Sequence, residues 1–241
     1  MATNQTDLIK QLVDVVEVAP TAPVWLEFLV GDEHTFDSVT VGGQTVWSSV
    51  SDYLPPPLEV LRTPWIQWTV LLPREMDGPR YAGIWQVGPA ALRALGVRDA
   101  LTHMEWFRRP DGTVAVSEVA VRPPGAQISS MLCYAHDFDL YAAWAQLMVC
   151  GTFTPAERAW SVGTVFLRGQ GSGHVRGVHG LGDLASEVRA LVIESRLPQA
   201  GQVSSASYEG DGYVIVRHPE TAVVVDALRR LVTTVRVELG P

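Results

Sequence analysis

The chain has 241 residues, of which 47% are apolar and 18% charged, so it can bury a sizeable core in one large or two modest domains. Its formal net charge of −8 argues against nonspecific nucleic-acid binding, which requires a basic surface. No apolar run reaches the ~20 residues of a membrane span, and the polar N-terminus does not resemble a signal peptide. We expect Cys133 and Cys150 to be buried thiols in a reducing compartment, which predicts a cytoplasmic protein.

The first hundred residues are predicted to form mainly strands after one N-terminal helix. Glu33, Thr35 and Asp37 alternate onto one face of the first hairpin strand, where a single acid is more often solvated than functional. In chain order the predicted elements are a helix 7–18, a strand 24–30, a hairpin with strands 35–40 and 44–50, an irregular proline-rich stretch 53–64, a strand 65–72 and a short helix 89–95 with Pro89 in its first turn.

The stretch 103–126 carries the clearest local signal. Two runs with period-2 alternation flank Asp111 and Gly112, a pair that is typical of a tight hairpin turn. If the loop has two residues, Glu105 faces Glu118 across the hairpin. Two opposed carboxylates repel each other, but a divalent cation between them would reverse the sign of that interaction.

A longer turn leads to a different interpretation of the same hairpin. With a three-residue loop and Gly112 as a bulge, Glu105 pairs with Ser117, and Glu118 points away from it. The plainer alternative is an ordinary hairpin with one exposed face and scattered charges.

A candidate anion site follows the hairpin. Pro-Pro-Gly at 123–125 ends the strand just after Arg122, and apolar spacing predicts a helix at about 127–135. A helix N-terminus behind a glycine-containing turn attracts anions. A second helix is expected at 139–150, with Asp137 as its cap and Gly151 as its end.

The composition changes after Gly151. Residues 152–157 are typical of a linker, and strands separated by glycine-rich turns dominate the remainder. Gly169, Gly171 and Gly173 lie between two predicted strands and open no helix, so they favour a hairpin loop over a phosphate-binding loop. The predicted elements are strands 160–167, 174–178, 190–197 and 212–217, a helix 218–232 and a strand 233–239.

Glu105 and the pattern Glu118-x-Ala120-x-Arg122-Pro-Pro-Gly125 together resemble the ATP-grasp superfamily, specifically its carboxylate–amine ligase branch. The resemblance covers most of the chain. It implies that Glu105 and Glu118 bind the magnesium ions that bridge the ATP phosphates. It also implies that Arg122 binds a substrate carboxylate or the acyl phosphate. Ala120 stands where the family usually has asparagine, which affects one metal contact.

Residues 25–33 resemble the hinge strand of the same family. By that match, Glu27 and the backbone of Phe28 and Leu29 lie at the adenine of ATP. The same match places Glu33 at the ribose hydroxyl groups.

The resemblance implies an α+β architecture. Residues 1–151 correspond to the ATP-grasp large subdomain, a mostly antiparallel mixed sheet with helices on one side, and residues 152–241 to a small C-terminal α+β domain. Complete members also have an N-terminal domain and a subdomain whose lysines hold the ATP phosphates. Of 18 Lys and Arg residues here only Lys10 is a lysine, and it matches neither phosphate lysine, so we expect the first third of such an enzyme to be missing.

The chemistry implied by the resemblance is amide formation. ATP phosphorylates a carboxylate, and an amine attacks the acyl phosphate, with ATP and Mg²⁺ as cofactors and small molecules as substrates. We expect the isolated chain to be inactive and to have no membrane or nucleic-acid partner; a homodimer or the missing N-terminal half is the expected protein partner. His103 is a minor candidate for proton transfer. The alternatives are a non-catalytic binding protein, one half of a split enzyme, or a carboxylase-type or purine-biosynthesis-type member.

Overall fold

The computed structural model describes residues 27–63 and 66–241, and the chain divides into two compact units, Met1–Val30 and Gly31–Pro241. In the first unit only residues 27–30 are described, and they form neither helix nor strand, so the predicted strand is wrong there. The remainder of that strand and the predicted helix 7–18 lie outside the described residues.

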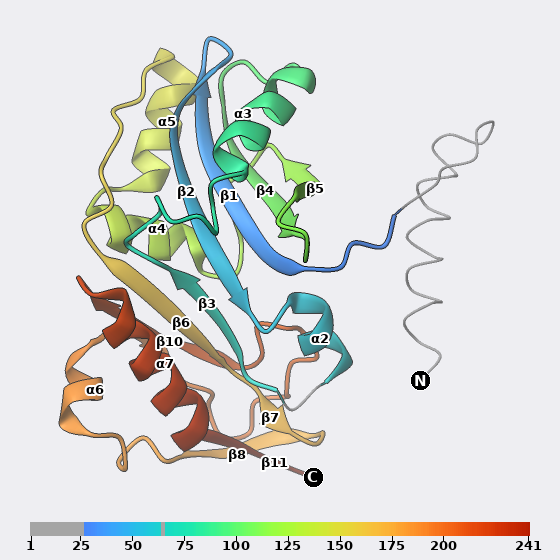
Figure 1. The fold of residues 1–241 in the computed structure, drawn as a ribbon. Coiled ribbons are helices and arrows are strands. Elements are labelled where there is room, and N and C mark those ends of the chain that lie inside the picture. Colours follow the sequence, from blue (N-terminus) through green and yellow to red (C-terminus); the bar gives the residue numbers. More distant parts are fainter. Residues whose placement is uncertain (1–26, 64–65) are drawn as a thin grey trace. The chain divides into compact units, whose positions relative to one another are not determined.

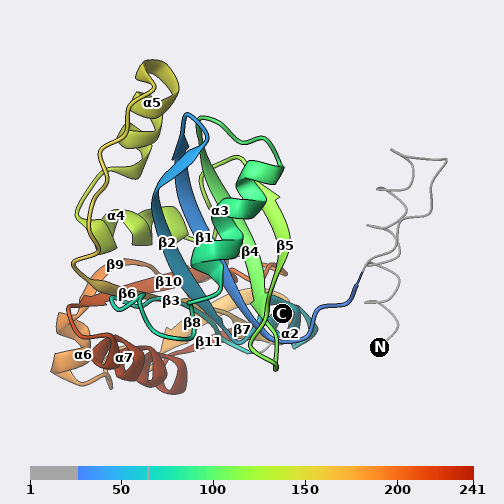
Figure 2. The same ribbon diagram turned by 45° about the horizontal axis from the view of Figure 1, so that its top comes forward.

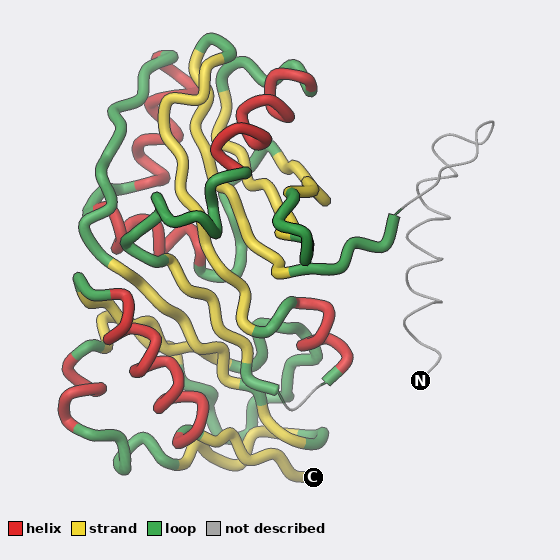
Figure 3. Tube along the Cα trace, viewed as in Figure 1, coloured by secondary structure: helices red, strands yellow, loops and turns green. Residues whose placement is uncertain are grey.

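Within the described residues, eight strands of the second unit form one sheet, in the order β5-β4-β1-β2-β3-β6-β10-β9 (Figures 1 and 3). Every pair of neighbours in this sheet is antiparallel, in agreement with the mostly antiparallel sheet that we expected. The strands are β1 (Asp32–Val41), β2 (Gln44–Leu54), β3 (Trp68–Leu72), β4 (Ala100–Arg108), β5 (Val114–Ala120), β6 (Ser161–Leu167), β9 (Val192–Arg196) and β10 (Gly212–His218).

Helices cover both faces of this sheet, whereas the sequence predicted helices on one side (Figure 2). On one face α4 (Ile128–His136) and α5 (Leu140–Cys150) pack around Trp68 and Phe166. On the other face α3 (Ile84–Ala94) packs on Phe36, and α7 (Thr221–Thr234) packs on β6 and β10. The short helices are α2 (Pro57–Arg62) and α6 (Ser186–Ala190).

The C-terminal part of the chain continues the main sheet. β3 pairs with β6, so strands of both predicted domains are hydrogen-bonded into one sheet. The C-terminal part also forms a small mixed sheet in which β11 lies between β7 and β8 (Figure 1). Its strands are β7 (Gly169–Gln170), β8 (His174–His179) and β11 (Arg236–Gly240). Gly171 and Gly173 lie in the turn between β7 and β8. These two strands do not pair with each other, because β11 lies between them, so the predicted hairpin loop is wrong.

Three local predictions need correction. The stretch 53–64 is not wholly irregular, because β2 continues to Leu54 and α2 begins at Pro57, a position where the absent N–H costs no hydrogen bond. α3 begins at Ile84, so Pro89 lies inside the helix instead of at its start. Asp139, not Asp137, caps α5, and Gly151 ends that helix in the left-handed conformation as predicted.

The cysteines also differ from the prediction. Cys133 is half-buried, and Cys150 is exposed at the end of α5. No helix in the described part of the chain has the length and apolar character that crossing a membrane would require.

Candidate functional site

The central hairpin brings two glutamates face to face. β4 and β5 pair so that Glu105 lies opposite Glu118 and His103 lies opposite Ala120, as the sequence predicted. Because side chains alternate along a strand, both carboxylates are on the same face of the sheet.

The turn that produces this register differs from the prediction. Near the turn Arg108 pairs with Val114, and the N–H of Arg109 donates to the carbonyl of Thr113 at 2.8 Å, so residues 110–112 form a three-residue loop. Gly112 adopts the left-handed conformation (φ 83°) that such loops place at this position. That register alone would turn Glu118 away from Glu105. A bulge next to Ser117 shifts the pairing by one residue, and the two glutamates are opposed again.

Glu105 is held by two neighbours on the same face. The hydroxyl of Tyr53 donates to its carboxylate at 3.2 Å, and Nε2 of His103 lies 3.8 Å from the same oxygen. Burial alone would raise the pKa of Glu105, but His103 and Tyr53 outweigh it and hold this pKa below its ordinary value. Glu105 is therefore ionised at neutral pH, the state that a metal ligand requires.

His103 is itself fixed by a buried acid on β1. Its Nδ1 lies 2.7 Å from Asp37, whose other oxygen accepts a hydrogen bond from Thr35 at 2.9 Å. Burial opposes the charged form of His103, but the charge and hydrogen bond of Asp37, together with Glu105, raise its pKa to about 10. The imidazole is therefore a cation, so it serves to position charge and is poorly suited to proton transfer at neutral pH.

The alternating polar residues of β1 share one face, as predicted, but that face lies toward Glu105 and His103 and is not solvated. Asp37 and Thr35 are buried, and Thr35 also contacts Ser51 at 2.5 Å. Glu33 is buried at the start of the row, and burial together with the charge of Glu105 raises its pKa to about 7. The sequence indicated the alternation, but it did not indicate that the row is buried.

Arg122 lies just beyond the end of β5, and its side chain is exposed. Its Nη1 donates to the carbonyl of Pro123 at 3.0 Å. Among the described residues it makes no ion pair with Glu105 or Glu118, although its charge contributes to lowering the pKa of Glu105. The guanidinium therefore lies near Glu105 and Glu118, which we call the acid pair, but forms an ion pair with neither.

The connection from β5 to α4 is strained. Ala126 (φ 50°) and Gln127 (φ 58°) are consecutive non-glycine residues in the left-handed region, a conformation that persists only where the surroundings enforce it. The hydroxyl of Ser129 donates to the carbonyl of Pro124 at 2.7 Å and ties the turn to the first residues of α4. Such strain is frequent at functional sites and lies here beside the predicted anion site.

Tyr208, which the sequence analysis missed, brings the C-terminal part of the chain to the acid pair. Burial, Glu209 and then Glu105 raise the pKa of its hydroxyl. Its ring meets Trp68 edge-on at 4.9 Å, and Trp68 lies 5.3 Å from the ring of Tyr53. Tyr208 follows a serine-rich loop with no regular spacing, so no sequence signal could have identified it.

The predicted adenine residues belong to the separate unit Met1–Val30. Glu27, Phe28 and Leu29 lie there in a segment without regular secondary structure, and Phe28 is exposed. Their role at a nucleotide stays a prediction, as does that of Glu33 at the ribose.

The donor set suits a metal ion that is shared with another ligand. In the described part of the chain, no group of three or more His, Cys, Asp or Glu side chains could hold a metal ion alone. Magnesium, however, is commonly bound by one or two carboxylates together with substrate phosphates and water. Glu105 and Glu118 supply such a pair.

Known proteins resemble this chain in part of its sequence and in its fold. No family model matches the chain. A curated relative, the L-arginine-specific L-amino acid ligase of Bacillus subtilis, is 26% identical over 118 residues, which are 49% of this chain and 28% of the relative.

Solved structures share the fold over most of this chain. The L-amino acid ligase from Bacillus licheniformis gives a TM-score of 0.69 at 16% identity and covers 89% of this chain and 55% of its own. Phosphoribosylglycinamide synthetase from Anaerococcus prevotii gives 0.63 at 11% identity, with coverages of 89% and 55%. N5-carboxyaminoimidazole ribonucleotide synthetase from Thermotoga maritima gives 0.62 at 15% identity, with coverages of 92% and 57%.

This chain thus spans little more than a quarter of the curated relative and about half of each solved structure. The shared architecture is an antiparallel sheet with helices on both faces and a small mixed sheet at the C-terminal end. The chain therefore has the ATP-grasp fold, which it shares with these ligases and synthetases.

Proposed function

We propose that this chain is the C-terminal portion of an ATP-dependent ligase that joins a carboxylate to an amine through an acyl phosphate. The observation that carries the proposal is the opposition of Glu105 and Glu118, within a fold that an L-amino acid ligase shares over 89% of the chain. The names of the relatives suggest amino acids as both the acid and the amine.

The acid pair has the first role in this proposal. Glu105 and Glu118 would hold Mg²⁺, which would offset the negative charge of the nucleotide phosphates during phosphoryl transfer. Protonated His103 keeps Glu105 ionised, and Tyr53 fixes the orientation of its carboxylate. Phosphoryl transfer depends mainly on positioning and charge stabilisation, which are the tasks that these residues can perform.

Arg122 has the second role. Its side chain is exposed, and the hydrogen bond that the structure gives it goes to a backbone carbonyl. It can therefore turn to an anion without breaking an ion pair to either glutamate. A guanidinium binds carboxylates and phosphates through two parallel hydrogen bonds, which suits the acid substrate or its acyl phosphate.

The nucleotide would contact the start of the described chain. By resemblance, Glu27 and the backbone of Phe28 and Leu29 would bind the adenine, and Glu33 the ribose. The isolated chain would not turn over, because its single lysine, Lys10, does not replace the phosphate-binding lysines of complete enzymes. A partner chain or an N-terminal segment would supply them.

The experiment joins this chain behind the N-terminal segment of the Bacillus subtilis ligase and supplies ATP, Mg²⁺ and L-amino acids. Hydroxylamine added to the reaction converts an acyl phosphate to a hydroxamate, which a ferric-chloride assay detects. We expect hydroxamate and ADP from the joined protein and neither from the chain alone. A joined protein that binds ATP but forms no hydroxamate with any amino acid contradicts the proposal.

Two alternatives make different predictions for the same assay. A carboxylase-type member releases ADP with bicarbonate as the acid. A purine-biosynthesis-type member, which the likeness to phosphoribosylglycinamide synthetase favours, releases ADP with an amino acid as the acid and a phosphoribosylamine as the amine. A non-catalytic protein is favoured by the presence of only one lysine, Lys10, and by Ala120 in the place of asparagine. Such a protein binds a partner or a small acid and releases no ADP under any of these conditions.

A further inference from the structure

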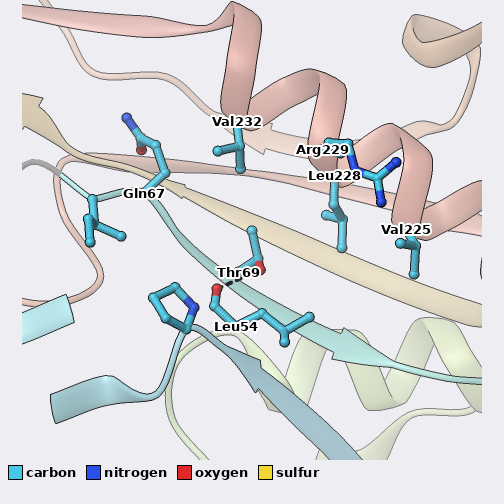
Figure 4. A pocket seen from close by; sticks show the side chains of 9 residues that line it. Leu54, Gln67, Thr69, Val225, Leu228, Arg229 and Val232 are labelled. Atoms are coloured by element: carbon cyan, nitrogen blue, oxygen red, sulfur yellow. Dashed lines mark hydrogen bonds between the residues drawn. The ribbon is translucent and has the colours of Figure 1, made fainter. Parts of the chain in front are cut away.

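A groove of about 390 Å³ lies on the face of the sheet that is opposite the acid pair (Figure 4). Leu54 lines it, whereas its neighbour on β2, Tyr53, points to the other face and bonds to Glu105. The apolar lining comes from the end of β2, the start of β3 and one side of α7: Leu54, Pro55, Ile66, Val225, Leu228 and Val232.

Two of the polar residues in the groove are already satisfied within the protein. The amide of Gln67 donates to the carbonyl of Arg168 at 2.9 Å and accepts from its N–H at 2.8 Å. The hydroxyl of Thr69 donates to the carbonyl of Leu54 at 2.7 Å, the bond drawn in Figure 4. Neither side chain needs a ligand to complete its hydrogen bonds.

Arg229 differs from both. Its guanidinium lines the groove beside Val225, and within the described part of the chain it makes no ion pair (Figure 4). The next residue, Arg230, is paired with Asp226 at 2.8 Å on the same helix. The groove therefore combines an apolar floor with one positive charge that no described side chain neutralises.

We propose that this groove binds an amphipathic carboxylate, a molecule with an apolar body and a single carboxylate, such as a medium-chain fatty acid. The apolar body would cover Leu228, Val225 and Val232, because removing apolar surface from water is favourable. The carboxylate would form two hydrogen bonds with Arg229. The volume lies within the range of small-molecule sites, in which a few polar groups orient a mainly apolar ligand.

The site is independent of the proposed ligase chemistry, because it uses none of the residues around Glu105. Binding can therefore be tested on the full chain without any assay of ATP turnover. A ligand bound in the groove would still contact the end of β2, the strand that carries Tyr53.

The experiment is a calorimetric titration of the full chain with sodium octanoate. Octylammonium, which has the same tail and the opposite charge, and acetate, which has no tail, are the controls. We expect saturable binding of octanoate and none of either control at the same concentrations. Octanoate that does not saturate, or octylammonium that binds as well, overturns the proposal.

Variants locate the site. Arg229→Gln should weaken octanoate binding at least tenfold, whereas Arg230→Gln, the matched change at the paired neighbour, should leave it unchanged. Val232→Glu, which places a carboxylate in the groove wall, should weaken binding as well and serves alone if Arg229→Gln does not fold. Unchanged octanoate affinity in the folded groove variants contradicts the assignment.

Discussion

Glu105 and Glu118 lie directly opposite each other on β4 and β5, at positions where cross-strand partners of like charge destabilise a sheet. The protein offsets the negative charge of only one of these two carboxylates. Glu105 receives a hydrogen bond from Tyr53 and lies close to protonated His103, whereas Glu118 is exposed. The arrangement therefore leaves a negative charge that a cation can neutralise.

His103 should remain protonated well above neutral pH. Its pKa is about 10 in the folded protein and 6.5 ordinarily, so the stability that its charge contributes is present below pH 6.5 and is lost as the pH rises through 10. NMR of the imidazole carbon-bound protons should show no titration of His103 between pH 6 and 8.5. Asp37→Asn should bring its midpoint down into that interval. A wild-type midpoint near 6.5 would show that the pair with Asp37 does not hold.

His136 should make the protein sensitive to acid. Arg158 donates to its Nε2 at 3.5 Å and its Nδ1 contacts the carbonyl of Ala156 at 2.9 Å, so the ring is neutral with its proton on Nδ1. Burial and Arg158 lower its pKa to about 4, below the ordinary 6.5. The unfolded chain therefore binds this proton first as the pH falls, and stability is lost between pH 6.5 and 4.

The loss should be on the order of 3 kcal/mol, because one pKa unit corresponds to about 1.4 kcal/mol. His136→Asn keeps an N–H donor for Ala156 and cannot be protonated. Urea unfolding at pH 7 and pH 4.5 should give a smaller difference in the free energy of unfolding for this variant than for wild type. Equal differences would remove His136 as a cause.

Asp139 should stabilise α5 as its cap. Its carboxylate accepts from the backbone N–H groups of Tyr141 at 2.9 Å and Ala142 at 3.0 Å. Asp139→Ala should lower the free energy of unfolding by about 1 kcal/mol, and Asp139→Ser, which keeps an acceptor, should lower it less. Urea unfolding at neutral pH compares the three proteins, and no loss for the alanine variant would argue against the cap.

Arg122 should act in catalysis and not in folding. In the joined ligase, Arg122→Lys should keep the melting temperature and lower kcat/KM by an amount equivalent to about 2–4 kcal/mol, as other fixed charge-stabilising donors do. Arg93→Lys, at an exposed position of α3, is the control. Unchanged kcat/KM for Arg122→Lys would assign this residue a structural role.

Local sequence patterns predicted most strands and helices, because each depends on spacing within a short segment. The opposition of Glu105 and Glu118 was also predictable, but for an incomplete reason. The alternation around Asp111 and Gly112 is compatible with either loop length, and a bulge next to Ser117 leaves no mark on the polarity of the neighbouring residues. The correct pairing results from a three-residue loop and a bulge, which shift the register by one residue each, in opposite directions.

The remainder of the site depends on contacts between distant residues. His103 and Asp37 are 66 positions apart and meet because β4 pairs with β1, a neighbour that is not adjacent along the chain. Tyr208 reaches the acid pair from the C-terminal part of the chain. The position of helices on both faces is equally non-local, because periodicity identifies the apolar side of α3 but not the face of the sheet that it covers.

The most direct test of the acid pair measures the melting temperature with increasing MgCl₂, against NaCl at equal ionic strength, in the wild type and in Glu118→Gln. A ligand that binds only the folded state stabilises it by mass action, so Mg²⁺ should raise the wild-type melting temperature above the NaCl control. Glu118→Gln should not respond to Mg²⁺ and should melt no lower than wild type without it, because the variant removes a repelling charge. Glu187→Gln, at an exposed position of α6, should respond as wild type does. An equal magnesium response in wild type and Glu118→Gln would contradict the assignment of these two glutamates as a metal site.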